Sequence, residues 1–150
     1  MKIIEANKFH SSIIYEMLTH YREVTPIEFL KHCDNEYYIN KLLAHIFAGR
    51  GVALLAYHDD KPIGMLLGLI EQSIWDPDIC IMKELAYWVE PDSRGTSAGY
   101  RLLSKYNEVA QSLSDMGRIK TWTISKMVNS PDLNYGKLGF RKIEETWSMN

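Results

Sequence analysis

From Val89 to Tyr100 the chain reads VEPDSRGTSAGY, a run rich in small residues. An apolar segment, Ile79 to Val89, leads into this run, and apolar residues at helical spacing follow it. The order predicts a strand, a tight turn and the start of a helix. Such a turn directs backbone N–H groups toward one point at the positive end of the helix dipole, and this arrangement binds phosphate. A ligand that carries a pyrophosphate is therefore the first to consider.

Length, composition and charge limit the classes of protein to which this chain can belong. A chain of 150 residues, 46% of them hydrophobic, is long enough for one domain, residues 1–150, with a buried core. The net charge of −2 gives no reason to expect nucleic acid or an acidic membrane as a partner. No apolar run approaches the ~20 residues of a membrane span, and the N-terminus lacks the apolar region of a signal peptide. We therefore expect a cytoplasmic protein.

Metal binding is not expected from the cysteines and histidines. The five histidines form no HxxH or HExxH pattern, and Cys33 and Cys80 lie far apart without metal-ligand spacing. We expect both cysteines to be reduced thiols.

The periodicity of apolar residues predicts a mixed α/β arrangement, an α+β sheet with helices packed on it. Thr25-Pro26-Ile27-Glu28 resembles a capping box at a helix start, and Ser130-Pro131 resembles an N-cap followed by a first-turn proline. Six strands are expected at 2–6, 52–57, 63–70, 79–89, 119–124 and 140–147. Helices are expected at 9–21, from 25 onward, and at 34–48, 99–117 and 130–139.

Two local motifs and this element order resemble the GNAT family of acyl-CoA-dependent N-acetyltransferases. The family loop V-x-P-x-x-R-G-x-G-x-G is matched by Val89, Pro91, Arg94, Gly95, Thr96, Ser97, Ala98 and Gly99. A second pattern, Y-x-K-x-G-F, is matched about 40 residues later by Tyr135, Lys137, Gly139 and Phe140. Together the motifs are fairly specific, and the resemblance covers nearly the whole chain. It implies a GNAT fold, although the family's last strand is expected to be missing, and transfer of an acetyl group from acetyl-CoA to a primary amine.

The predicted cofactor site is the loop itself. The amides from Arg94 to Gly99 can donate to the pyrophosphate of coenzyme A, and Arg94 can also bind phosphate through its guanidinium. Ser97 replaces the usual glycine and would be strained if it needed a positive φ. The resemblance adds backbone pairing of the pantetheine arm near Tyr87 and Val89. An ordinary solvated turn is the alternative. The predicted cofactor-binding residues are Tyr87, Val89, Arg94, Gly95, Thr96, Ser97, Ala98, Gly99 and Tyr100.

Two residues are candidates for catalysis. Tyr135 matches the family tyrosine that protonates the leaving thiolate, and its alternative role is packing of the last helix. Glu84 falls where many relatives place a base that acts through water, within an apolar run that can raise the pKa of its carboxyl. Its alternative role is a structural carboxylate paired with a basic group. The amide near Val89 is the oxyanion donor that the resemblance implies.

The acceptor side is less defined. Relatives build it from the first two helices, their connection and the loop before the long central strand. A cationic amine would suit aromatic and acidic residues there, although a packed core with solvated acids explains them equally well. Relatives often carry an asparagine seven residues before the tyrosine, where this chain has Val128, with Asn129 and Ser130 beside it. The acceptor candidates are Tyr21, Arg22, Glu23, Phe29, Tyr37, Tyr38, Trp75, Asp76 and Asp78.

The missing family strand would leave one sheet edge open. We expect either the strand at 140–147 to move into that gap or a second copy to cover it as a homodimer. A non-catalytic acyl-CoA-binding regulatory module and a protein-interaction domain that uses this edge are the alternative functions. The compact size also resembles small GNAT proteins of tailed bacteriophages, which implies the host cytoplasm as location.

Overall fold

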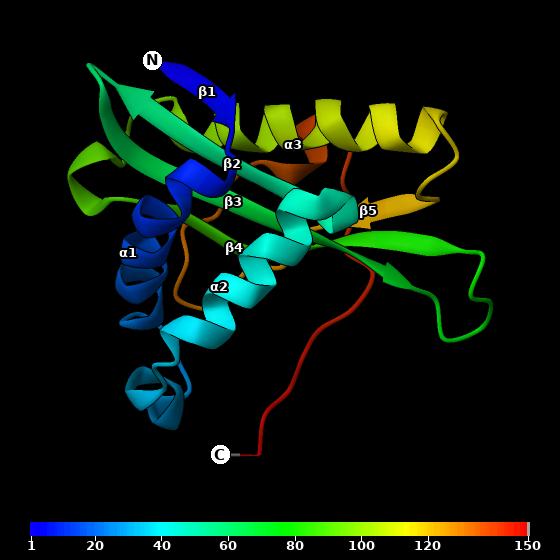
Figure 1. Cartoon of the computed structure of the whole chain (residues 1–150), viewed down its shortest axis with the longest axis horizontal. Coiled ribbons are helices and arrows are strands. Elements are labelled where there is room, and N and C mark those ends of the chain that lie inside the picture. Colours follow the sequence, from blue (N-terminus) through cyan, green and yellow to red (C-terminus); the bar gives the residue numbers. More distant parts are fainter. Residues whose placement is uncertain (150) are drawn as a thin grey trace.

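The centre of the molecule is one five-stranded sheet in the order β1-β2-β3-β4-β5, seen in the computed structural model, which describes residues 1–149 (Figure 1). The first four strands pair antiparallel with their neighbours, whereas β5 runs parallel to β4, so the sheet is mixed as expected. The strands are β1 Lys2–Glu5, β2 Gly51–His58, β3 Lys61–Gln72, β4 Cys80–Val89 and β5 Thr121–Thr123.

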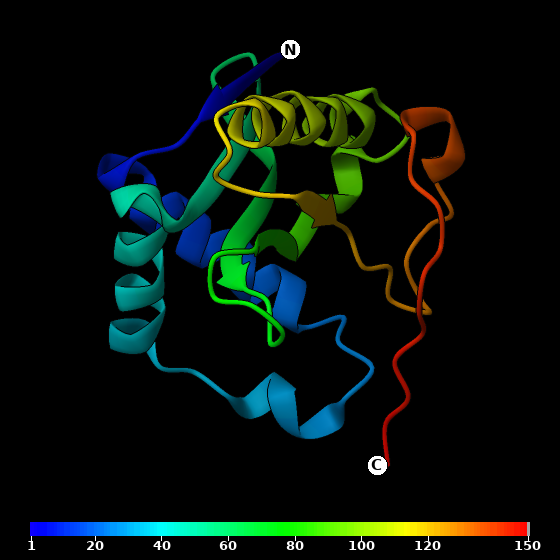
Figure 2. The ribbon, with the colours of Figure 1, turned by 90° about the vertical axis from the view of Figure 1, so that its right-hand side faces the viewer.

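Helices cover both faces of the sheet (Figure 2). On one face α1 (Ser11–Arg22) and α2 (Glu36–His45) bury Ile14 and Leu43 against the strands. On the other face α3 (Ala98–Asp115) buries an apolar stripe that includes Leu102, Leu103 and Tyr106. The sheet therefore separates two apolar clusters, because its strands are apolar on both faces.

Single helical turns connect these elements. They are η1 Lys8–His10, η2 Glu28–His32, the π-turn η3 Ile46–Arg50, η4 Pro91–Ser93 and η5 Tyr135–Leu138. Gly117 follows α3 with a φ of 77°, as the sequence predicts for glycine after a helix. Gly49, which the sequence predicts to end a helix, lies inside η3, where its φ of 99° interrupts the helical backbone.

The sheet opens between β4 and β5. Pairing of the two strands stops at Lys83 and Thr123. The hydroxyl of Tyr106 donates to the carbonyls of Thr123, at 3.0 Å, and of Met82, at 3.4 Å, so the ring stands at the base of the opening. Gly68 makes room for this ring, since a Cβ there would lie 2.9 Å from its Cε2 atom. From Glu84 to Val89, β4 pairs with β3 alone among the strands of residues 1–149.

Three local predictions are wrong. Residues 140–147 form no strand and join none of the strands of residues 1–149, so the expected sixth strand does not move into the gap. The Thr25 side chain accepts from the amide of Ile27 rather than closing a capping box, and only the turn η2 follows it. The last helical turn begins at Tyr135 with Asn134 as its cap, not at Ser130. In each case the local signal lacks a tertiary partner that would complete the element.

Among the helices of residues 1–149, none is both long and apolar enough to cross a membrane.

Candidate active site

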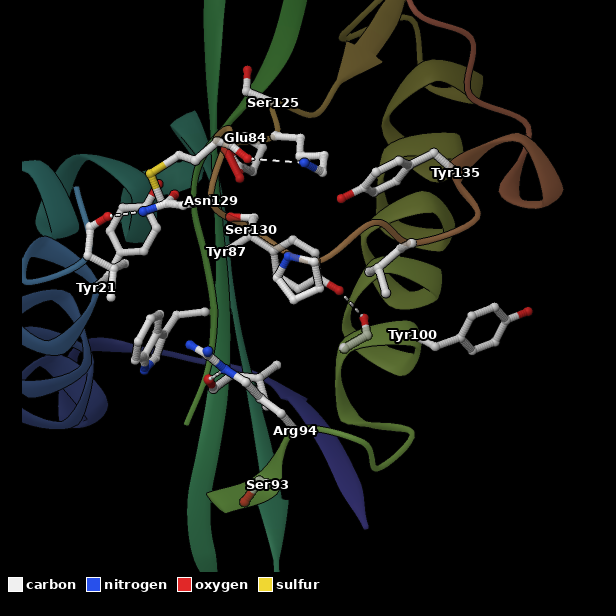
Figure 3. A pocket seen from close by; sticks show the side chains of 18 of the residues that line it. Tyr21, Glu84, Tyr87, Ser93, Arg94, Tyr100, Ser125, Asn129, Ser130 and Tyr135 are labelled. Atoms are coloured by element: carbon white, nitrogen blue, oxygen red, sulfur yellow. Dashed lines mark hydrogen bonds between the residues drawn. The ribbon is translucent and has the colours of Figure 1, made fainter. Parts of the chain in front are cut away.

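A pocket of about 310 Å³ lies where β4 and β5 diverge (Figure 3). Its walls come from the end of α1, the open part of β4, the loop into α3, and the segment after β5. The lining residues are Tyr21, Val24, Glu84, Tyr87, Trp88, Val89, Ser93, Arg94, Gly95, Thr96, Gly99, Tyr100, Ser125, Lys126, Met127, Asn129, Ser130, Pro131, Leu133 and Tyr135.

Four amides of the loop are unpaired within residues 1–149, namely those of Gly95, Ser97, Gly99 and Tyr100. The predicted site included three further amides whose protons are already used. Arg94 donates to the carbonyl of Pro91, Thr96 to that of Ser93, and Ala98 to the hydroxyl of Thr96. Three of the four unpaired amides belong to residues that line the pocket, and two of them stand in the first turn of α3. The set is suited to an anion such as a pyrophosphate.

The backbone of the loop explains why serine is tolerated at position 97. Gly95 carries the positive φ, 86°, that a side chain rarely adopts. Ser97 has a φ of −79°, which any residue adopts. The strain that a positive φ at Ser97 would have caused is therefore absent.

The Arg94 side chain does not reach toward the loop amides. Its Nε donates to the carbonyl of Val89 at 3.0 Å, and its guanidinium lies over the Trp88 ring, 4.7 Å from the ring centroid. These contacts bring the cation to the β4 wall of the pocket (Figure 3). The Arg94 amide is also bonded, so the predicted phosphate contact through that amide is not available in this conformation. The predicted contact through the guanidinium would have to use its terminal nitrogens, because Nε is engaged.

The open edge of β4 presents backbone groups to the pocket. Glu90 donates to the carbonyl of Ile63, so the adjacent Val89–Gly64 pair is of the type whose N–H and C=O point away from the partner strand. The bond from Arg94 to the Val89 carbonyl agrees with this direction. The same alternation turns the N–H of Tyr87 outward. Both amides can therefore pair with an extended, amide-containing chain lying in the opening.

Tyr87 connects β4 to the first turn of α3. Its hydroxyl donates to the carbonyl of Gly99 at 2.5 Å, and a Cβ at Gly99 would lie 2.9 Å from that oxygen. Burial raises the pKa of the Tyr87 phenol, and the nearby Tyr135 and Glu84 raise it further. The Tyr87 side chain is therefore uncharged and held in place between β4 and the loop.

Glu84 stands where the pairing of β4 and β5 ends. Burial raises the pKa of its carboxyl to about 8 from the ordinary value of 4.5. None of the ion pairs among residues 1–149 includes Glu84, which argues against a structural carboxylate held by a basic group. A carboxyl group of this kind can release and accept a proton near neutral pH.

Tyr135 enters the pocket from the opposite wall. It is the first residue of η5, and its phenol points toward the side of the pocket that holds Glu84 (Figure 3). Burial raises the pKa of the phenol, and the negative charges of Glu84 and Asp132 raise it further. The ring also packs against the apolar cluster under α3, so catalytic and packing roles coexist in one side chain.

One residue predicted for the acceptor side, Tyr21, lines the pocket. It meets the Trp88 ring edge-on, with 6.3 Å between the ring centroids, and burial raises the pKa of its phenol to about 12. Aromatic residues predicted beside it do not line the pocket and are largely exposed, namely Phe29 at 64%, Tyr37 at 71%, Tyr38 at 65% and Trp75 at 88%. The loop before β4, which holds Trp75, Asp76 and Asp78, also lies outside it.

The segment after β5 supplies a further wall of the pocket. The Nδ2 of Asn129 donates to the carbonyl of Val24 at 2.7 Å, so this segment spans the pocket to the end of α1. Val128 occupies the position of the family asparagine and is 88% exposed, whereas its neighbours Asn129 and Ser130 line the pocket. Matching the family asparagine one residue later in the sequence would have identified Asn129.

Among residues 1–149, no cluster of three or more histidine, cysteine or acidic side chains is arranged to hold a metal ion. Cys33 and Cys80 are free cysteines.

Known proteins agree with this architecture. Residues 14–140 match the model of the Acetyltransferase (GNAT) family. No curated protein matches the sequence significantly.

Solved structures share the fold at low sequence identity. An acetyltransferase of Trypanosoma brucei superposes with a TM-score of 0.70 at 18% identity, covering 99% of this chain and 98% of its own. A predicted acetyltransferase with acetyl-CoA from Clostridium acetobutylicum gives 0.72 at 14% identity, covering 99% and 95%. A ribosomal-protein-alanine N-acetyltransferase of Brucella melitensis gives 0.64 at 13% identity, covering 100% and 99%.

Proposed function

The chain belongs to the acetyltransferase (GNAT) family, and from this premise we propose that it transfers an acetyl group from acetyl-CoA to a primary amine of a small molecule or a protein. The observation that carries the proposal is that one pocket joins the loop amides, the open edge of β4, Glu84 and Tyr135. The family uses acetyl-CoA, and these groups fit its parts in order: amides for the pyrophosphate, a free strand edge for the amide-containing arm, and two titratable groups where the thiol would end.

The thioester supplies an acetyl carbon that the amine attacks while the carbon–sulfur bond breaks. Glu84, as the carboxylate, accepts the proton that the amine loses, directly or through a water molecule. Tyr135 donates its phenolic proton to the departing thiolate. The outward N–H of Val89 can stabilise the negative charge on the acetyl oxygen. Burial keeps the Tyr135 phenol protonated and keeps the pKa of Glu84 near working pH.

The direct test is an assay with the purified chain, acetyl-CoA and a panel of primary amines. The panel holds a polyamine, a lysine-containing peptide and a peptide with a free N-terminus. We expect amine-dependent release of free thiol and an acetylated product by mass spectrometry. Binding of acetyl-CoA without any acetylated product would favour the non-catalytic acyl-CoA module. An absence of both binding and turnover would favour the protein-interaction domain.

Two finer assignments concern location and subclass. A cytoplasmic location agrees with two free cysteines, because reducing compartments keep thiols unpaired. The bacteriophage-type subclass, and with it the host cytoplasm, is a proposal that depends on the resemblance alone.

A further inference from the structure

The side-chain amide of Asn107, on α3, joins three elements. Its Oδ1 accepts a hydrogen bond of 2.7 Å from the indole Nε1 of Trp122 on β5. Its Nδ2 donates to the carbonyl of Leu138 in η5, at 3.1 Å. One residue thus connects the helix, the edge strand and the turn that begins with Tyr135.

Chemistry fixes the orientation of this amide. An indole N–H can only donate, so the oxygen of Asn107 must face Trp122. The nitrogen then faces Leu138, where a backbone carbonyl can only accept. Both partners are satisfied in this orientation, and exchanging the oxygen and nitrogen of the amide would break both bonds.

The segment carrying Tyr135 has few other polar attachments. Within residues 1–149, two hydrogen bonds join residues 125–138 to residues 1–124: Asn107 to Leu138, and Asn129 to Val24. The second lies at the acceptor end of the pocket, and the first lies within the turn that holds Tyr135. The other contacts of this turn are apolar packing of Tyr135 and Leu138 against the cluster under α3. Such packing is not directional, so it does not by itself fix the position of η5 along α3 or the rotation of η5 about its own axis.

From this geometry we propose that Asn107 is a positioning residue for Tyr135, holding η5 at the distance from α3 that aims the phenol into the pocket. The inference rests on the proposed function, in which the phenol is the proton donor. A displacement of about 1 Å at a reacting group can cost about a hundredfold in rate, so one directional bond at this turn is enough to matter.

Two substitutions separate the bonds. Asn107→Leu has a similar volume and removes both bonds. Asn107→Asp keeps an acceptor for Trp122 but places an oxygen against the Leu138 carbonyl, so the bond to the turn is lost. Gln111→Leu is the matched control, because Gln111 lies one turn further along α3 and its amide bonds Asp115 at an exposed site. We expect both Asn107 variants to lower kcat about tenfold, within the range for displaced groups, with little change in KM, and the control to leave both unchanged.

A double-mutant cycle tests whether Asn107 acts through Tyr135. We expect Asn107→Leu to lower kcat about tenfold beside Tyr135, and by less than about twofold in the Tyr135→Phe background, since the group it positions is then gone. Equal losses in both backgrounds, or a change confined to KM, would overturn the proposal. If Asn107→Leu fails to fold, Asn107→Asp serves in the same cycle.

A spectroscopic measurement that does not depend on catalysis distinguishes failure of the proposed function from failure of the positioning by Asn107. The chain is labelled with 3-fluorotyrosine, and the resonance that disappears in Tyr135→Phe is assigned to Tyr135. We expect this resonance to shift in both Asn107 variants and to stay in place in Gln111→Leu. If no amine is acetylated but the resonance shifts, the proposed function fails and the positioning by Asn107 stands. A resonance that stays in place in folded Asn107 variants overturns the positioning whatever the activity.

Discussion

The hydroxyl of Tyr87 on β4 donates to the carbonyl of Gly99 at the first turn of α3, across 2.5 Å. This bond holds the strand edge and the loop amides at a fixed separation. Because the phenol fills the space beside Gly99, a Cβ at that position would lie 2.9 Å from its oxygen. The small residue is thus required by a tyrosine twelve positions earlier in the sequence.

Gly99→Ala is expected to displace the first turn of α3. We predict a loss of stability of about 1–2 kcal/mol from overpacking and an affinity for acetyl-CoA lower by about tenfold. Thermal unfolding and calorimetric titration measure the two quantities. The double variant Tyr87→Phe/Gly99→Ala is the matched comparison, since it removes the oxygen that the methyl group meets. Partial recovery of stability and binding is expected there, because the double variant relieves the overlap but also loses the hydrogen bond to the Gly99 carbonyl. Wild-type behaviour of Gly99→Ala alone would contradict the contact.

Glu84 should govern the pH dependence of the reaction. Since burial raises the pKa of its carboxyl to about 8, the carboxylate form increases as pH rises through that value. We predict that kcat/KM rises between about pH 7 and pH 9 and then levels off, and that Glu84→Gln lowers it about a hundredfold and flattens the profile. A rising profile that persists in Glu84→Gln would show that another group is responsible.

The same carboxyl should make stability depend on pH. Its pKa is higher in the folded chain, about 8, than its ordinary value of 4.5, so the folded state binds the proton more tightly. The stability present below pH 4.5 is therefore lost as pH rises through 8. Each pKa unit is worth about 1.4 kcal/mol. We therefore predict that the free energy of unfolding of Glu84→Gln, relative to that of the wild type, is higher at pH 9 than at pH 5 by roughly 1–3 kcal/mol. Urea unfolding at both values measures this. If the difference in free energy of unfolding between the two proteins is the same at pH 5 and pH 9, the burial of Glu84 is contradicted.

Tyr135→Phe removes the proposed proton donor but keeps the ring. We predict that kcat falls about ten- to a hundredfold, while the affinity for acetyl-CoA stays within about twofold. Steady-state kinetics and calorimetry separate the two effects. If kcat is unchanged in Tyr135→Phe, the tyrosine has only its packing role against the cluster under α3.

The homodimer stays a prediction. β5 is one of the two edge strands of the described sheet, and residues 140–147 do not join it. Ile143 and Trp147 in this segment are 65% and 87% exposed. We predict a dimer mass by light scattering and a monomer mass after removal of residues 140–150. A monomer mass for the full chain at high concentration would contradict the prediction.

The turn from Val89 to Tyr100 and the apolar surroundings of Glu84 were predictable from sequence because both are local. A strand, a small-residue turn and a helix signal their own geometry, and an acid within an apolar run signals its own burial. The strand predicted at 140–147 was wrong because that prediction was also local. The alternation of apolar and polar residues favours a strand, but a strand forms only when it pairs with another strand. Asn107 was missed, and Asn129 was noted only as a neighbour of Val128, because their side-chain bonds reach residues distant in sequence and no local pattern predicts such bonds.

A ¹H–¹⁵N correlation spectrum of the labelled chain, titrated with acetyl-CoA, tests the central claim most directly. We expect the largest shifts at the amides of Gly95, Ser97, Gly99 and Tyr100, accompanied by those of Tyr87 and Val89 on the open edge of β4. If saturating acetyl-CoA leaves these amides in place, or moves only signals remote from the opening between β4 and β5, the account of this pocket is contradicted.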